Sequence, residues 1–147
     1  MSMNYRAAEK ILYSYPVNMM RRQEALIALM RIRGETDCHA QNYGGIKHEE
    51  GTPSDPPGDY VNRLLKAERD LAKYSGMIRP VKEVRRELMK SSDERAGIML
   101  KVMERVYFEN VGIKELACEM GMNERTLYRR REELVRLVME ERRKENA

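Results

Sequence analysis

The apolar residues of this chain recur at helical spacing in almost every segment, and no segment alternates apolar and polar residues as a β-strand does. Ala8 and Leu12 share one helical face near the N-terminus, and Val81, Val84 and Leu88 repeat the pattern farther along. The spacing predicts an all-α fold.

Prolines and glycines are expected to divide the N-terminal part of the chain. A first helix over residues 5–13 should end before Pro16, because the residue before a proline disfavours the helical conformation. Asn18 is then expected to cap a second helix over residues 19–33, which Gly34 ends. The predicted buried stripe of that helix consists of Met19, Leu26, Leu29 and Met30. Residues 1–34 are therefore expected to form an N-terminal helical hairpin.

A segment rich in glycine and proline follows. Residues 34–59 hold five of the nine glycines and three of the five prolines, which predicts a flexible linker over 35–59. Cys38, His39 and His48 fall in this linker, but they lack a fourth ligand and the paired spacing typical of zinc sites. We expect a solvated loop there and no metal site.

The remaining residues, 60–147, are expected to form a C-terminal helical bundle. Its first helix is predicted over residues 60–74, with apolar residues at helical intervals facing inward: Val61, Leu64, Leu65 and Leu71. Ser75-Gly76 should end that helix, and Pro80 should occupy the first turn of the next, 80–90. A helix capped at Ser92 or Asp93 should run to about residue 108, with a turn over 110–112 after it. The final helix is expected to fray beyond about Arg142.

Residues 113–139 have the spacing of a helix-turn-helix. That unit needs a small residue in its first helix, a glycine in its turn and an apolar anchor in its second helix. Ala117, Gly121 and Leu127 meet these requirements, and Asn123 is a suitable N-cap for a second helix that starts at Glu124. The spacing therefore predicts a helix of the kind that enters a DNA major groove.

Four arginines lie within seven residues of this second helix. At roughly 100° per residue, Arg125 and Arg129 lie opposite Leu127 and point outward, toward guanine edges in a bound groove. Arg130 and Arg131 flank the apolar stripe, which suits them to phosphates or to structural ion pairs. An isolated charge run is more often a solvated helix face, in which Arg129 pairs with Glu133. The framework around Gly121 favours DNA binding.

The run DERAGIMLKVMERVYFENVGIKELACEMGMNERTLYRRREELVRLV resembles the promoter-recognising C-terminal region of bacterial sigma factors. The shared features are Tyr107-Phe108 before the turn, Glu115-Leu116-Ala117 in the first helix and Thr126-Leu127-Tyr128-Arg129 in the second. Over about 60–141 the chain looks most like the RinA/ArpU-type phage regulators, small sigma-like activators of late genes. The resemblance implies promoter contacts by Arg125, Thr126, Tyr128 and Arg129. The core-binding regions of a complete sigma factor are absent, which favours an activator over a stand-alone sigma subunit.

Together, spacing and resemblance give one set of predicted DNA-binding residues. They are Asn123, Glu124, Arg125, Thr126, Tyr128, Arg129, Arg130, Arg131 and Arg136.

Composition limits the other function classes. The net charge of +4, from 28 Lys and Arg against 24 Asp and Glu, is too small to identify a nucleic-acid binder by itself. No long apolar run predicts a membrane span, and two cysteines are typical of a reducing compartment, most simply the cytoplasm. The resemblance to phage regulators implies that this is the cytoplasm of a host cell. No arrangement of nucleophile and base, and no glycine-rich phosphate loop, predicts an enzyme or a cofactor.

The leading hypothesis is a sequence-specific transcription regulator that activates phage late genes for packaging and lysis. Its expected partner is double-stranded DNA, bound as a homodimer, since one recognition helix covers only a few base pairs. The N-terminal hairpin is a candidate for dimerisation or for contacting host RNA polymerase, and packing against its own body is the alternative. Two other functions stay open: a phage terminase small subunit, and a helix-turn-helix that binds protein instead of DNA.

Overall fold

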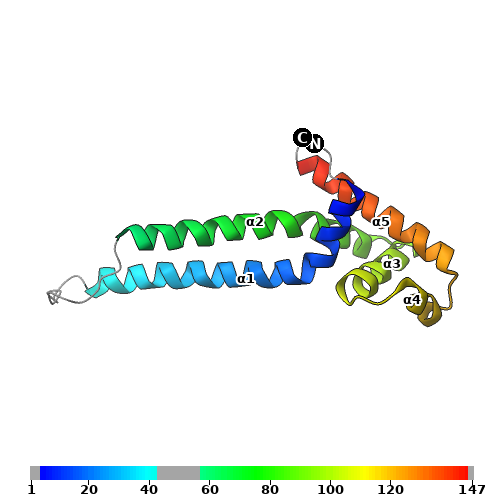
Figure 1. Ribbon diagram of the computed structural model, residues 1–147, viewed down its shortest axis with the longest axis horizontal. Helices are drawn as coiled ribbons and strands as arrows, with labels where there is room; N and C mark the ends of the chain where they lie inside the picture. The colour runs from blue at the N-terminus through cyan, green and yellow to red at the C-terminus, as the bar shows by residue number, and fades with distance from the viewer. Residues whose placement is uncertain (1–3, 43–56, 146–147) are drawn as a thin grey trace. The chain divides into compact units, whose positions relative to one another are not determined.

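The computed structural model describes the backbone of residues 4–42 and 57–145 and the side chains of residues 4–34 and 58–145. All elements in these ranges are helical, which confirms the predicted all-α class. In chain order they are α1 (Tyr5–Asn42), α2 (Pro57–Lys90), α3 (Glu94–Lys101), the π-helical segment η1 (Val102–Phe108), α4 (Ile113–Met120) and α5 (Glu124–Glu145) (Figure 1). No helix of the described part is long and apolar enough to cross a membrane.

The predicted break in the N-terminal helix is wrong. Helix α1 runs without interruption through Pro16 and Gly34, so no hairpin forms within residues 1–34. A proline inside a helix removes one backbone hydrogen bond, and the burial of Leu12 and Tyr15 beside Pro16 favours the continued helix. Asn18 is therefore not a cap. Its Nδ2 donates to Ser14 Oγ at 3.0 Å within α1.

The predicted division at Ser75-Gly76 is also wrong. Helix α2 continues through both residues and through Pro80, which lies in its interior and is fully buried. Ser75 uses its Oγ to accept a hydrogen bond from Arg22 Nε at 3.1 Å. Tertiary contacts therefore override the local tendency of these residues to end a helix.

The predicted linker is shorter at both ends than 35–59. Helix α1 extends to Asn42 and α2 begins at Pro57, so residues 35–42 and 57–59 are helical. The rest of the predicted linker, including His48, lies outside the described residues, as do the side chains of Cys38 and His39.

The chain divides into two compact units, Met1–Asn18 with Gly76–Ala147 and Met19–Ser75. The first unit holds the larger core, which combines the start of α1, the second half of α2 and all later helices. The predicted inward residues Val81, Val84 and Leu88 are buried in it, and Val102 and Val106 of η1 join them. The unit boundaries fall beside Pro16–Asn18 and at Ser75-Gly76, where helix ends were expected.

The last turns of α5 are tied to α2 within the first unit. Arg79 Nη2 donates to the Glu141 carbonyl at 3.0 Å, and Arg142 Nη1 donates to the Gly76 carbonyl at 3.2 Å. The Glu141 carboxylate is buried and is paired with both Arg79 and Lys144. These contacts explain why α5 continues to Glu145, beyond the point where fraying was expected.

The second unit contains the first half of α2 packed along α1, and its core is small. The predicted stripe is wrong at two positions, because Met19 and Met30 are exposed while Ala25, Leu29 and Ile32 are buried. On α2, Val61 and Leu65 are likewise exposed, contrary to prediction. The helix contact therefore uses smaller side chains than the sequence pattern indicated.

Candidate DNA-binding site

The turn between α4 and α5 is built around Gly121, whose φ of 62° lies in the left-handed region that favours glycine. The Met122 amide donates to the Ala117 carbonyl at 3.0 Å, and the Gly121 amide donates to the Cys118 carbonyl at 3.4 Å. These bonds satisfy the last carbonyls of α4 in the arrangement of a Schellman motif. The predicted turn residue is therefore confirmed, together with its role.

Asn123 caps α5 as predicted. Its side-chain Oδ1 accepts a hydrogen bond from the Arg125 amide at 3.1 Å, and its carbonyl accepts one from the Thr126 amide at 3.1 Å. An Asn in this position satisfies backbone N–H groups that a helix start leaves without partners. Capping uses the Oδ1 atom of the exposed Asn123 side chain, and its predicted contact with DNA stays a prediction.

The two helices are anchored by apolar residues at the predicted positions. Leu116 and Ala117 of α4 are buried, as are Leu127, Leu134 and Val138 of α5. Because Leu127 lies in the first turn of α5 and is fully buried, its burial fixes which face of the helix points outward.

An ion pair that the sequence did not suggest braces α4. Arg105 of η1 donates through Nη2 to Glu119 Oε1 at 2.6 Å and also pairs with Glu109. η1 has π-helical hydrogen bonding, and Asn110, with a φ of 58°, turns the chain from it toward α4. Arg105 and Glu119 are 14 residues apart, so their meeting depends on the course of this turn, which spacing alone does not predict.

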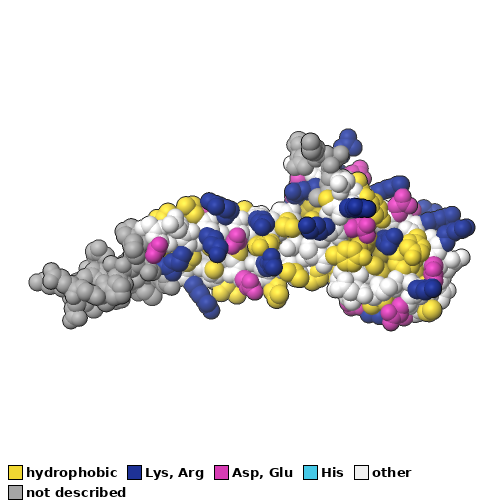
Figure 2. Space-filling view, in the orientation of Figure 1, with side chains coloured by type: hydrophobic (Ala, Val, Ile, Leu, Met, Phe, Trp, Pro, Cys, Tyr) yellow, Lys and Arg dark blue, Asp and Glu magenta, His cyan; other side chains and the backbone are white. Residues whose placement is uncertain are grey.

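The outward face of α5 carries the predicted arginines. Arg125 and Arg129 are exposed, Tyr128 is 47% exposed, and Thr126 is half-buried beside them. In the part of the chain that the structure describes, neither Arg125 nor Arg129 has an ion-pair partner, so the pairing of Arg129 with Glu133 is not formed. Figure 2 shows basic side chains along the outer edge that α5 forms in Figure 1.

Arg130 and Arg131 are turned against the protein. The Arg130 side chain is only 12% exposed and its Nη1 lies 2.7 Å from Glu133 Oε2. The Arg131 guanidinium lies 4.9 Å from the centre of the Tyr128 ring, and its buried Nε has no hydrogen-bond partner among the described residues. Of the two roles predicted for this pair, the structural one fits Arg130.

Two further predicted residues lie at the margins of this face. Arg136 is exposed but pairs with Glu132 at 2.9 Å, and Glu124 is half-buried in the first turn of α5. Sequence analysis did not single out Lys114, an exposed lysine in the first turn of α4. The N-terminus of a helix also favours anions such as a phosphate. The position of Lys114 two residues after Gly112, the N-cap of α4, was the available signal.

Tyr128 and Arg131 also line a cavity of about 260 Å³ beside the turn that precedes α4. Tyr13 of α1, Val106 of η1 and residues 110–113 complete its wall. Tyr13 packs edge-on against Tyr107, with 4.6 Å between the ring centres. Arg131 is therefore held at the junction of α5, α1 and η1, away from the exposed edge of α5.

No three His, Cys, Asp or Glu side chains come together to form a possible metal site within the described residues. No protein-family model, curated protein or solved structure matches this chain.

Proposed function

We propose that the chain is a sequence-specific DNA-binding transcription regulator that places the first half of α5 in the major groove. The observation that carries the proposal is the capped turn at Gly121–Asn123, which presents Arg125 and Arg129 unpaired on a rigid helix. Arginine forms paired hydrogen bonds to the O6 and N7 atoms of guanine, and a helix is the element that a major groove admits.

The dimensions of this face support the proposal. Arg125 and Arg129 are one turn apart, about 6 Å along the helix axis, so both reach base edges within one groove about 12 Å wide. Tyr128 and Thr126 lie beside them and are positioned for base or backbone contacts. Lys114 at the start of α4 is positioned for a phosphate on the flank of the groove.

The resemblance to RinA/ArpU-type regulators extends the proposal to the role of the protein in the host cell. On that basis the protein activates late phage genes in the host cytoplasm, as a homodimer on a site with two half-sites, and contacts host RNA polymerase. A terminase small subunit is the alternative, since such a protein also binds DNA through a helix-turn-helix but assembles into a ring.

A binding titration at two salt concentrations tests the proposal. Fragments from the region around the protein's own gene, including neighbouring late genes, are compared with random DNA of equal length. We expect one fragment to bind far more tightly than the rest, with an affinity that falls steeply as salt rises, because phosphate contacts release counterions. Weak binding that is uniform over all fragments would contradict sequence-specific regulation.

A further inference from the structure

The unit formed by residues 19–75 buries very little apolar surface. Its buried apolar side chains, within the described ranges, are Ala25, Leu29, Ile32 and Ala67. Helices are stable in water when an apolar stripe packs against another element, and two alanines contribute little to such a contact. Burial of further apolar surface against another partner would therefore stabilise this helix pair.

Six large apolar side chains of the same unit are exposed. They are Met19 (37%), Met20 (58%), Ile27 (41%), Met30 (65%), Val61 (47%) and Leu65 (46%). Single exposed apolar residues are normal, but a contiguous group on one small unit is typical of an interaction surface.

Most of these side chains share one side of the helix pair. At roughly 100° per residue, Met19, Leu26 and Met30 fall within about 40° of one another on α1. Val61 and Leu65 do the same on α2. Each sector lies roughly 60–160° from the residue that its helix buries against the other, Leu29 on α1 and Ala67 on α2, and in the same rotational sense. In an antiparallel pair, this places both sectors on the same side. We call the five residues of the two sectors the apolar face.

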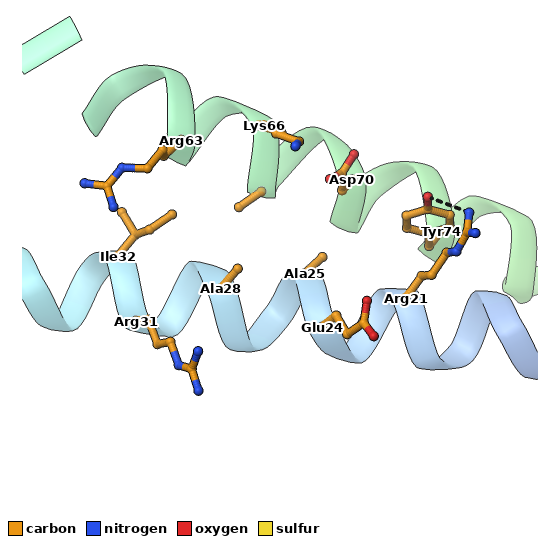
Figure 3. Close-up of a pocket in the computed structure, with 11 residues that line it drawn as sticks. Arg21, Glu24, Ala25, Ala28, Arg31, Ile32, Arg63, Lys66, Asp70 and Tyr74 are labelled. Atoms are coloured by element: carbon orange, nitrogen blue, oxygen red, sulfur yellow. Dashed lines mark hydrogen bonds between the residues drawn. The ribbon is translucent and has the colours of Figure 1, made fainter. Parts of the chain in front are cut away.

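The opposite side of the helix pair has a different character. There a groove of about 550 Å³ lies between α1 and α2, with alanines at its floor (Figure 3). Its rim carries charged and polar residues from both helices: Arg21, Glu24, Arg31, Arg63, Lys66, Asp70 and Tyr74. Four of the six exposed apolar residues, Met19, Met30, Val61 and Leu65, therefore lie on the side away from this groove. Met20 and Ile27 lie roughly 80–100° farther round α1.

Two hydrogen bonds fix the register of the helices. Arg22 Nε donates to Ser75 Oγ at 3.1 Å, and the neighbouring Arg21 Nη1 donates to Tyr74 Oη at 3.4 Å. Seven residues forward from Arg22 along α1 is Leu29, and seven residues back from Ser75 along the antiparallel α2 is Glu68. Leu29 and Glu68 therefore lie at the same level along the helix pair. By the same count Leu65 lies two residues beyond the level of Met30, about 3 Å along the axis.

We propose that the apolar face binds the same face of a second copy of this chain, with α1 of each copy lying over α2 of the other. The result is a four-helix bundle made of two helix pairs. A two-fold axis parallel to the helices preserves the levels, so Met30 of one copy meets Leu65 of the other. This inference rests on the proposed function in one respect: it identifies the surface through which the proposed DNA-binding homodimer forms.

Charge complementarity selects a second copy as the occupant. Arg33 of α1 and Glu68 of α2 project from the apolar side of their helices, and both are exposed. In the proposed arrangement, Arg33 of one copy lies about 6 Å along the axis from Glu68 of the other, within reach of a side chain that leans toward its helix N-terminus. The pair occurs twice in a symmetric dimer.

The size of the face fits this partner. From the level of Met19 to that of Val61 it is about 25 Å long, and two adjacent helices are about 20 Å wide. Two such faces in contact bury on the order of 1,000 Å² in total, which reaches the lower bound for a specific interface. The sequence places Gln23 between Met19 and Leu26, where a buried polar residue favours one register of helices over others.

Sedimentation equilibrium of the full chain without DNA tests this inference. We expect a dimer for the wild type, and we expect Met30→Glu and Leu65→Glu to raise the dimer dissociation constant by at least about tenfold. Met89→Glu is the matched control, because Met89 is also 65% exposed but lies in the other unit. Its dimer should be unchanged, and the helical circular dichroism of all three variants should match the wild type.

A charge exchange tests the arrangement. Arg33→Glu and Glu68→Arg should each weaken the dimer, and the double variant should regain wild-type association. A wild-type monomer at all concentrations, a dimer indifferent to Met30→Glu and Leu65→Glu, or a double variant that stays weak would overturn the proposal. An assembly larger than a tetramer would also overturn it and favour the terminase alternative. A wild-type dimer that binds no DNA sequence selectively would instead refute the proposed function and leave the dimer contact standing.

Discussion

The Tyr107 hydroxyl of η1 donates a hydrogen bond to Glu9 Oε2 of α1 at 3.0 Å, joining residues 98 positions apart. Tyr107 is fully buried, and burial together with the adjacent Glu9 carboxylate raises the pKa of its phenol above the ordinary value of 10.0. The start of α1 is thus joined to the helical segment that precedes α4 and α5, through a phenol that donates this hydrogen bond only in its protonated form.

The first prediction concerns stability at alkaline pH. Below pH 10 the Tyr107 phenol is neutral in the folded and unfolded states, so its contribution to stability is fully present. Above pH 10 the unfolded state loses this proton while the folded state keeps it, and stability falls as pH rises. In Tyr107→Phe, urea unfolding should show about 1 kcal/mol less stability at pH 7 and a shallower loss of stability above pH 10.

Tyr13→Phe is the control for this experiment, because Tyr13 is 45% exposed and packs against the same ring. It should keep the wild-type pH dependence. An identical alkaline slope in Tyr107→Phe and the wild type would show that the buried phenol does not govern the loss.

The second prediction tests the turn. Gly121→Ala should destabilise the protein by about 1 kcal/mol, because a side chain at a φ of 62° is strained although no atom lies within 4 Å of the added Cβ. Gly97→Ala in α3 has equally open surroundings and an ordinary helical backbone, so it should stabilise the protein by up to about 1 kcal/mol. Chemical denaturation of the two variants therefore gives changes of opposite sign, and a shared sign would contradict the turn geometry.

The third prediction concerns the cap of α5. Asn123→Ala removes the acceptor for the Arg125 amide and should cost about 1 kcal/mol, whereas Asn123→Asp keeps an acceptor and should cost much less. Thermal unfolding measures the difference. If Asn123→Ala lowers DNA affinity without changing stability, then Asn123 contacts DNA directly and the capping interpretation is incomplete.

The parts of the fold that the sequence predicted well are those decided by neighbouring residues. Ala117, Gly121, Asn123 and Leu127 lie within eleven positions, and each has a role that local backbone geometry imposes. The outward direction of Arg129 follows from the same local reasoning, since the burial of Leu127 fixes the face.

The failures occur where distant contacts decide. Pro16 and Ser75-Gly76 are strong local signals for a helix end, yet α1 and α2 continue through them. The boundaries of the two compact units fall just after Pro16, between Asn18 and Met19, and between Ser75 and Gly76, so these residues mark a change in packing partner and not a change in secondary structure. Local propensity is a weak prior against tertiary packing of this extent.

Helical periodicity also could not predict which side chains the residues of the candidate site contact. A helical wheel places Arg130 and Arg131 beside the apolar stripe, but it does not decide between a phosphate and a protein partner. In the structure Arg130 pairs with Glu133, and the Arg131 guanidinium lies over the Tyr128 ring.

The last prediction separates the two kinds of arginine on α5. Arg129→Ala should cost about 1–3 kcal/mol of binding free energy for the preferred DNA and relax the preference at one base pair, since the exposed guanidinium is free to pair with a guanine. Arg130→Ala is its neighbour and control. Because Arg130 is bound to Glu133 and only 12% exposed, its loss should weaken all sequences alike and by less. Titration of each variant against every single-base substitution of the preferred fragment measures both effects. Equal, sequence-independent losses from the two changes would refute the division of roles, because they would mean that Arg129 does not read a base.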